Sequence, residues 1–336
     1  MQMIKYPSIE QFRNIIKQVR LNAEYQGKDE DGNAIYDKNV TYPVIKFIGS
    51  CKAHGTNGSI VLNSENEYYA ESRNRILSLE ADNAGFFLFV MKNEGFFKNI
   101  LKTYLVGDVK AVSLSGEWAG GNIQSGVAIN GLPKMFLVFG LKLIYENESD
   151  DSTWVSRNDL NKFHNPEINT YFIDTFQTWE IDIDFNEPEY SQNRIVQWVQ
   201  EVENECPIGK YFDVSGIGEG IVFQSSDGNF KFKAKGDKHQ NSKVTVIASI
   251  DTDQIESVKE FVEYAVTENR LQQGITVMTE NNIQPDNKSI GHFIKWVVSD
   301  VMKEESDTII ENELDQKILT KQIQQKAKNW FINKYF

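Results

Sequence analysis

Cysteine is scarce in this chain of 336 residues, which contains only Cys51 and Cys206. Two cysteines cannot build a disulfide framework, and no Cys/His cluster has the spacing of a zinc site. No apolar run approaches the roughly 18 residues that a membrane helix needs. Residues 1–6 are polar and do not resemble a signal peptide. We therefore expect a cytoplasmic protein with no membrane partner.

Basic residues are also fewer than acidic ones, and the formal net charge is −13. Most of the excess negative charge lies in residues 146–205, which hold 15 acidic residues and three basic ones. The net charge argues against a nucleic-acid partner, because phosphate binding normally needs a basic surface. Two segments differ, since residues 228–243 and 314–336 each hold five lysines against one aspartate. These segments predict two basic patches on an acidic protein.

The length suggests two domains, with strand patterns before about residue 246 and helical patterns after it. Apolar spacing over residues 8–20 predicts a helix with Ser8 as its N-cap. Residues 22–41 are polar and predict a loop or an exposed hairpin, and the acidic segment predicts surface helices and loops. Helical spacing returns over residues 255–265, 290–301 and 318–331. We expect one domain over 1–246 and a small all-helical domain over 250–336.

Lys52 lies between an apolar run, residues 44–48, and the glycines Gly55 and Gly58. The run predicts a strand, and residues 59–62 predict another. A lysine at a strand end, before glycines that let the backbone approach a ligand, is typical of a nucleophilic amine beside phosphates. A hairpin turn with an exposed lysine explains the same pattern equally simply.

Residues 219–235 give the clearest local prediction. Two alternating segments flank Asp227-Gly228, which is a strong signal for a β-hairpin. Paired in this way, the strands place Glu219 at the same end as Lys233 and Lys235.

Several further motifs follow Lys52 in a fixed order: a basic Ser-Arg-Asn-Arg turn with Arg73 and Arg75, a strand-terminal Gly-Glu at Glu117, an aromatic strand that ends at Phe139, and then Glu219, Lys233 and Lys235. This ordered set resembles the covalent nucleotidyltransferases, which include ATP-dependent polynucleotide ligases and capping enzymes. The runs Lys52 to Asn57, Gly116 to Gly120 and Phe232 to Lys238 are most similar to the bacteriophage RNA ligase 2 branch. The similarity covers about residues 45–240.

The resemblance implies an α+β fold with antiparallel sheets around an ATP cleft. It implies an ATP-dependent and Mg²⁺- or Mn²⁺-dependent RNA ligase for RNA repair, acting on RNA with 5′-phosphate and 3′-hydroxyl ends. Lys52 would form a lysyl-AMP intermediate, and AMP would then pass to the RNA end. Because a neutral amine is the nucleophile, we expect nearby Lys233 and Lys235, bound metal and burial to lower the pKa of Lys52 toward 7. A monomer and a phage source are implied as well.

The resemblance also assigns roles to single residues. The catalytic group would be Lys52, Glu219, Lys233 and Lys235, which would also bind ATP together with Arg73, Glu117 and Phe139. Phe139 would stack on adenine, and Glu219 would serve the metal. The RNA contacts would be His54, Asn57, Arg75 and Lys238.

Two positions depart from the family pattern, which commonly has Asp where this chain has Gly140 and Lys where it has Gln224. If the missing groups normally pair, their joint absence is compensated; if each contacts substrate, sealing is in doubt. Three hypotheses remain open: an RNA ligase, a ligase of DNA or mixed strands with the same chemistry, and a non-catalytic protein that binds RNA ends. The helical C-terminal pattern favours the RNA ligase 2 branch, because DNA ligases and capping enzymes carry a strand-rich barrel there.

Overall fold

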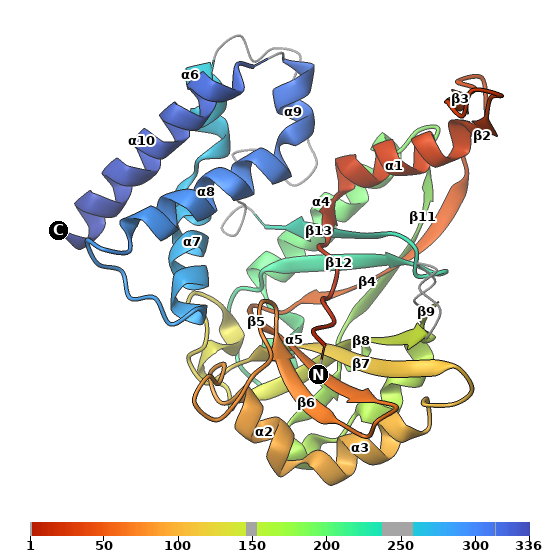
Figure 1. The fold of residues 1–336 in the computed structure, drawn as a ribbon, viewed down its shortest axis with the longest axis vertical. Coiled ribbons are helices and arrows are strands. Elements are labelled where there is room, and N and C mark those ends of the chain that lie inside the picture. The colour runs from red at the N-terminus through yellow and green to blue at the C-terminus, as the bar shows by residue number, and fades with distance from the viewer. Residues whose placement is uncertain (1, 146–152, 237–257, 313) are drawn as a thin grey trace.

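The computed structural model describes residues 2–145, 153–236, 258–312 and 314–336. Two sheets form the centre of the first two ranges, and helices form the last two (Figure 1). Nearly all neighbouring strands are antiparallel. The predicted α+β fold class is confirmed.

The first sheet has the strand order β1-β13-β12-β4-β11. Its strands are β1 (Glu10–Gln11), β13 (Lys231–Lys235), β12 (Gly220–Ser225), β4 (Val44–Lys52) and β11 (Thr178–Asp184). β12 and β13 pair antiparallel around the Asp227-Gly228 turn, so the predicted hairpin is confirmed. β1 runs parallel to β13.

The second sheet has the order β10-β8-β7-β5-β6, with β9 paired to β8. Its strands are β10 (Thr170–Phe172), β8 (Met135–Tyr145), β7 (Val109–Ala119), β5 (Gly55–Asn63), β6 (Tyr68–Ser72) and β9 (Thr153–Trp154). One hydrophobic core contains residues of both sheets, including Phe47 and Ile221 from the first and Leu114 and Val138 from the second.

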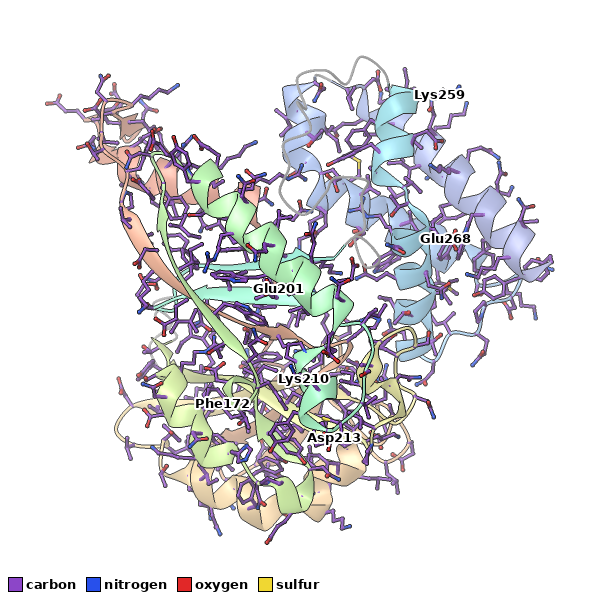
Figure 2. The ribbon with its side chains drawn as sticks, turned by 180° about the vertical axis from the view of Figure 1, so that it is seen from behind. Phe172, Glu201, Lys210, Asp213, Lys259 and Glu268 are labelled. Atoms are coloured by element: carbon purple, nitrogen blue, oxygen red, sulfur yellow. The ribbon has the colours of Figure 1, made fainter. Side chains whose placement is uncertain are left out.

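Helices and short 3-10 turns cover the two sheets. They are α1 (Phe12–Glu24), α2 (Phe86–Lys92), α3 (Glu94–Lys102), α4 (Glu189–Asn204), α5 (Pro207–Tyr211), η1 (Ala128–Gly131), η2 (Arg157–Phe163), η3 (Pro166–Ile168) and η4 (Ile173–Thr175). α4, which carries Glu201 in Figure 2, packs on β11, β12 and β13 through an apolar face that includes Ile195 and Val199. On the second sheet, Phe86 of α2 and Phe97 of α3 pack against Phe136.

The described C-terminal residues form helices with a separate hydrophobic core. They are α6 (Val258–Ala265), α7 (Glu268–Glu280), α8 (Ile290–Glu304), α9 (Ser306–Glu311) and α10 (Gln316–Tyr335). Helical spacing therefore located α6, α8 and α10 correctly but missed α7 and α9. The predicted domain boundary near residues 246–250 lies outside the described residues, so the division into two domains stays a prediction.

Two local predictions need correction, and a third is confirmed. Ser8 does not cap α1: Glu10 and Gln11 pair with β13, so the helix begins only at Phe12. The acidic segment contains sheet strands as well as helices and loops, since β11 pairs with β4 and buries Trp179. Residues 22–41 do form an exposed hairpin, with strands β2 (Tyr25–Lys28) and β3 (Ala34–Tyr36).

None of the helices in the described part of the chain combines the length and the apolar composition of a membrane span.

Candidate active site

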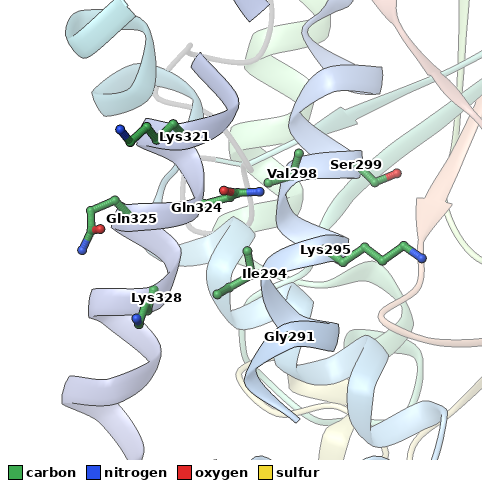
Figure 3. A pocket seen from close by; sticks show the side chains of 9 residues that line it. All are labelled: Gly291, Ile294, Lys295, Val298, Ser299, Lys321, Gln324, Gln325 and Lys328. Atoms are coloured by element: carbon green, nitrogen blue, oxygen red, sulfur yellow. The ribbon is translucent and has the colours of Figure 1, made fainter. Parts of the chain in front are cut away.

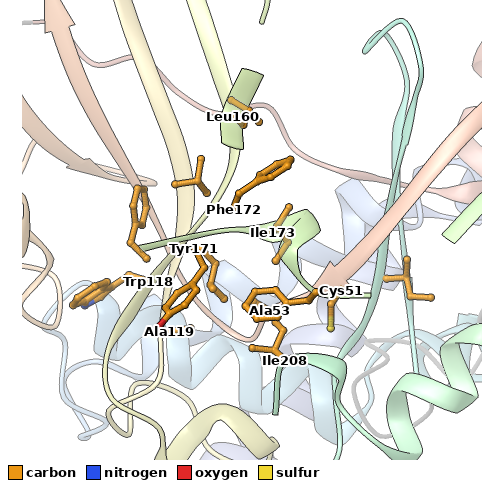
Figure 4. Close-up of a cluster of buried hydrophobic side chains, with 14 of the residues drawn as sticks. Cys51, Ala53, Trp118, Ala119, Leu160, Tyr171, Phe172, Ile173 and Ile208 are labelled. Carbon is orange, nitrogen blue, oxygen red and sulfur yellow. The ribbon is translucent and has the colours of Figure 1, made fainter. Parts of the chain in front are cut away.

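Lys52 ends β4, and the chain crosses from the first sheet to the second just after it. Its neighbours Cys51 and Ala53 are buried among the apolar side chains shown in Figure 4. A simple hairpin turn at this lysine is therefore wrong, because β4 and β5 belong to different sheets. The two buried neighbours fix the backbone of Lys52 at the junction, while its side chain remains 21% exposed.

Gly55 and Gly58 have a packing role. A Cβ atom at Gly55 would lie 2.3 Å from the carbonyl oxygen of Trp118, and one at Gly58 would lie 2.6 Å from the ring of Phe86. Real Cβ atoms do not approach other atoms so closely, so only glycine lets β5 pack against β7 and α2. Gly55 also lines the cavity described below, so close approach of a ligand to its backbone stays a prediction.

Alternation along β13 directs its three lysines to one face of the sheet. Phe232 and Ala234 are buried in the core, where Phe232 contacts Phe12 of α1. Lys231, Lys233 and Lys235 take the opposite face, because side chains alternate along a strand. Their opposite partners on β12 are Gln224, Val222 and Gly220, and Gly220 also lies opposite Lys52. The register thus brings Lys52 onto the same face as the lysines of β13.

Glu219 is the centre of the resulting charge cluster. Lys52 Nζ donates to its Oε2 at 2.7 Å, and Lys235 Nζ lies 3.1 Å from its Oε1. His54 Nδ1 lies 3.1 Å from Oε2. The Glu219 residue is only 3% exposed, and a buried carboxylate requires such partners. The predicted proximity of Lys52, Glu219 and Lys235 is therefore confirmed.

Gly220 makes this cluster possible. Its φ of +150° is strained for residues with a side chain, and a Cβ atom would lie 2.1 Å from the carbonyl oxygen of Ala234. Since Gly220 pairs with Lys52 on one side and Lys235 on the other, its close packing sets the spacing between those two lysines.

The pKa shifts in the cluster follow from this arrangement. Burial lowers the pKa of Lys52, but the carboxylates of Glu219 and Glu117 outweigh it and raise that pKa above its ordinary value. Burial and the neighbouring Lys52 and Lys233 lower the pKa of Lys235, despite the opposing effect of Glu219. Burial would raise the pKa of Glu219, but Lys52, Lys235 and His54 together hold it well below its usual range. The pKa of Lys52 is therefore raised in the protein without ligands, and the expected fall toward 7, which included a bound metal, stays a prediction.

This cluster lines a cavity of about 800 Å³, here called the main cavity. Its walls come from both sheets, the segment before α1, and α7 and α8. The sequence-predicted residues that line it are Lys52, His54, Asn57, Arg73, Glu117, Phe139, Glu219, Lys233 and Lys235. Arg75 is not among the lining residues, and its Nη2 donates to the carbonyl oxygen of Asp82. Lys238 lies outside the described residues.

Contacts of Glu117 and Arg73 position the remaining charged groups. Glu117 Oε1 accepts a hydrogen bond from the backbone N–H of Gly55 at 3.1 Å, across the β5–β7 pair. Arg73 Nη2 donates to Ser8 Oγ at 3.4 Å and lies at the exposed edge of the cavity. Of the two arginines in this turn, only Arg73 therefore reaches the main cavity.

An aromatic group that sequence reasoning missed surrounds Lys231. Its ammonium lies 3.5 Å from the ring centroid of Trp154 and donates to Tyr6 Oη at 3.1 Å. Tyr6 also packs edge-on against Phe139, with ring centroids 5.0 Å apart. Burial and the nearby Arg157 and Lys142 lower the pKa of Lys231 to about 7. The alternating Lys-Phe-Lys-Ala-Lys pattern was the available signal that Lys231 shares the face of the other two lysines.

The same group lies beside the two positions that depart from the family pattern, Gln224 and Gly140. Gln224 lies directly opposite Lys231, and its Oε1 accepts from Arg157 Nη1 at 3.5 Å. A Cβ atom at Gly140 would lie 3.0 Å from the Trp154 ring. The Lys231 ammonium thus lies beside Gln224, where the family pattern has Lys, and the Trp154 ring lies beside Gly140, where it has Asp.

Sequence reasoning also missed Glu304, the last residue of α8. Lys233 Nζ donates to its carboxylate at 3.1 and 3.3 Å, so Lys233 belongs to a different ion pair from Lys52 and Lys235. Nearby, Arg13 of α1 donates to Glu305 Oε2 at 2.7 Å. The helical region is joined to the first sheet and to α1 through these contacts.

We compared the sequence of this chain with models of known protein families. Residues 45–245, more than half of the chain, match the family model described as RNA ligase. The chain belongs to the RNA ligase family. The matched range contains Lys52, Glu219, Lys233 and Lys235, together with both sheets except β1.

Solved structures of an RNA ligase from Naegleria gruberi are similar to this RNA ligase family member. One, a mutant with AMP and Mn, has 17% identity and a TM-score of 0.44 over 69% of this chain and 56% of its own. Another, with PPi, has 19% identity and a TM-score of 0.44 over 70% and 58% of the respective chains. The chain thus spans little more than half the length of these proteins. A search of curated proteins gave no match.

Proposed function

We propose that this chain is an ATP-dependent RNA ligase that joins a 5′-phosphate to a 3′-hydroxyl end through AMP covalently bound to Lys52. The observation that carries the proposal is the contact of Lys52 Nζ with Glu219 Oε2 at 2.7 Å, beside Lys235, in the main cavity. A cavity of about 800 Å³ is large enough for a nucleotide. Its Phe139 ring offers a stacking surface for adenine, as the family resemblance implies.

In the first step, Lys52 Nζ attacks the α-phosphorus of ATP. A P–N bond forms, the bond from that phosphorus to the β-phosphate oxygen breaks, and pyrophosphate leaves with the electron pair. Lys52 must first lose a proton, which passes to solvent. The low pKa of Glu219 makes its carboxylate a poor proton acceptor, so its contact with Nζ serves to position the amine.

In the second step, an oxygen of the RNA 5′-phosphate attacks the phosphorus bound to Lys52. The P–N bond breaks, and Lys52 leaves as an amine that regains a proton. In the third step, the 3′-oxygen of the other end attacks the activated 5′-phosphate. AMP leaves, and the hydroxyl proton passes to solvent. The ammonium groups of Lys233 and Lys235 offset the charge on the reacting phosphates.

The remaining lining residues suit the roles that the resemblance implies. Arg73 and Glu117 would hold the ribose and the adjoining strand, and His54 and Asn57 would contact the RNA ends. Arg75 faces away from the cavity lining, so an RNA contact there would lie outside the main cavity. The proposal also includes a role in RNA repair, action as a monomer, a phage source and membership of the RNA ligase 2 branch. The C-terminal region, which is helical throughout its described residues, supports the assignment to that branch.

A divalent cation is part of the proposal, as ATP-dependent transfer of this type implies. Among the described residues, no three His, Cys, Asp or Glu side chains gather as a metal site. Glu219 already contacts three basic side chains, so the protein provides no preformed metal site in this part of the chain. A cation bound to the nucleotide phosphates would add positive charge beside Lys52 and thereby favour its neutral amine. Glu219 as a metal ligand stays a prediction.

The test is transfer of label from α-labelled ATP with Mg²⁺, comparing the wild type with Lys52→Ala and with Lys46→Ala as a matched control on the same strand. We expect label on the wild type and on Lys46→Ala, and none on Lys52→Ala. A folded wild type that stays unlabelled would contradict the proposal and favour a non-catalytic protein that binds RNA ends. Nicked RNA, DNA and hybrid duplexes then identify the strand that the enzyme joins.

A further inference from the structure

A second cavity of about 620 Å³ lies between α8 and α10, here called the α8–α10 groove (Figure 3). Ile294 and Val298 of α8 form an apolar floor, and Gln324 of α10 points toward them across the groove. Lys295, on α8, and Lys321, on α10, extend to opposite sides of it (Figure 3). The groove is therefore an apolar strip with the Gln324 amide inside and lysines along both edges.

The lysines of the groove lack acidic partners within the described chain. Lys295, Lys321 and Lys328 are exposed, and none of them forms an ion pair with a described carboxylate. Other lysines of α10 do: Lys326 pairs with Glu263 at 3.0 Å, and Lys334 with Glu268 at 3.6 Å. On a chain with a net charge of −13, three uncompensated ammonium groups around one groove favour an anionic ligand from outside.

The groove and the main cavity both adjoin α8. Ser299 lines both, and it lies one helical turn from Lys295 on the same side of α8. Trp296 and Lys303 of the same helix line the main cavity. A strand that leaves the main cavity over Ser299 would therefore meet Lys295 first and the lysines of α10 beyond it.

We propose that the α8–α10 groove binds the sugar–phosphate backbone of the RNA strand whose end lies in the main cavity. This inference rests on the proposed function. Lysines hold phosphates without reading sequence, amides of Gln324 and Gln325 pair with ribose hydroxyls, and the apolar floor accepts ribose or base faces. Because the groove shares Ser299 with the main cavity, the polynucleotide whose end lies there is favoured over an acidic protein segment.

The experiment compares the triple variant Lys295→Gln/Lys321→Gln/Lys328→Gln with the control Lys92→Gln/Lys102→Gln/Lys110→Gln. The control lysines are equally exposed, form no ion pair with described residues, and lie on α2, α3 and β7, away from α8. Binding of a single-stranded RNA with a 5′-hydroxyl and a blocked 3′ end is measured over a range of salt concentrations without ATP. This RNA cannot react, so failure of the ligase chemistry leaves the binding result interpretable. Self-adenylylation is measured in parallel.

We expect the triple variant to bind RNA about tenfold more weakly than the wild type. The slope of the logarithm of RNA affinity against the logarithm of salt concentration should become shallower by about two, because each lost phosphate contact removes roughly 0.7. The control should keep the wild-type slope, and both variants should keep wild-type self-adenylylation. The proposal would be overturned by equal losses of RNA affinity in the triple variant and the control, by an unchanged salt slope in the triple variant, or by a wild type that does not bind RNA. If polyglutamate competes for the groove as strongly as unlabelled RNA does, the proposal is also overturned, and an acidic protein partner is favoured instead. If the triple variant unfolds, each single variant should lower the slope by about 0.7.

Discussion

Glu304 on the helical region pairs with Lys233 on β13, at 3.1 and 3.3 Å from its ammonium nitrogen. Gln11 donates to the same carboxylate at 3.3 Å. Burial would raise the pKa of Glu304, but the Lys233 ammonium outweighs it and lowers that pKa to about 2. A residue far along the chain thus neutralises one of the lysines that the main cavity offers to phosphates.

Replacing Glu304 by Gln should strengthen ATP binding, because the phosphates no longer compete with a carboxylate for Lys233. We expect the KM for ATP in self-adenylylation to fall several-fold and the free energy of unfolding to fall by about 1–3 kcal/mol. Glu268→Gln, which alters an exposed carboxylate that pairs with Lys334 and accepts a hydrogen bond from Trp330 Nε1, serves as the control. Weaker ATP binding by Glu304→Gln would show instead that this carboxylate helps to position Lys233 for the nucleotide.

The same pair predicts how stability depends on pH. The pKa of Glu304 is lower in the folded protein than in the unfolded chain, so its contribution is complete above about pH 5 and is lost as pH falls toward 2. The stability difference between wild type and Glu304→Gln should therefore be constant at neutral pH and narrow in acid. Denaturant unfolding of both proteins at several pH values measures this difference in unfolding free energy. A difference that grows as pH falls would be inconsistent with the pair.

The raised pKa of Lys52 can be measured by competitive labelling with an amine-specific reagent, followed by mass spectrometry. We expect Lys52 in the ligand-free protein to react more slowly than the exposed lysines Lys92 and Lys110 at pH 8 to about 10, because Glu219 favours its ammonium form. Glu219→Gln should lower the pKa of Lys52, since burial and Arg73 are then opposed by Glu117 alone. No change in the Lys52 labelling profile in a folded Glu219→Gln variant would refute this account.

Lys231 predicts a pH dependence of nucleotide binding. Its pKa of about 7 means that it loses its positive charge as pH rises through neutrality, while the nucleotide remains an anion. ATP affinity of the wild type should therefore fall over this range, and Lys231→Gln should flatten that dependence. Lys92→Gln, which alters an exposed lysine of α2 that does not line the main cavity, is the comparison. Isothermal titration with ATP at several pH values measures the effect, and an identical profile for Lys231→Gln would exclude it.

Gly220→Ala tests the steric basis of the charge cluster. The added Cβ would lie 2.1 Å from the carbonyl oxygen of Ala234 at a φ of +150°. We expect a loss of about 3 kcal/mol or more in unfolding free energy, from backbone displacement and unfavourable φ together. Gly107→Ala has a positive φ but no atom within 4 Å of the new Cβ, so it should cost only about 1 kcal/mol. Equal losses in the two variants would mean that φ alone accounts for the effect.

Local sequence patterns predicted much of the fold and part of the site. The Asp227-Gly228 turn, the alternation of Lys231 to Lys235 and the apolar spacing of α8 each depend on neighbours within a few residues, where backbone preferences and side-chain periodicity act. The same patterns placed Glu219 at the lysine end of its hairpin. They failed for β11, whose acidic sequence forms a strand because β4 supplies its hydrogen-bond partners and a place to bury Trp179.

The sequence by itself determined which residues carry amines and carboxylates, and it placed Lys52, Glu117, Glu219 and Lys235 at strand ends. Only the tertiary structure decided which charges pair, because β4, β12 and α8 are far apart in the chain. It assigned Glu219 to Lys52 and Lys235, and Glu304 to Lys233. It also decided that the pKa of Lys52 is raised in the protein without ligands, since at contact distance an opposite charge outweighs burial.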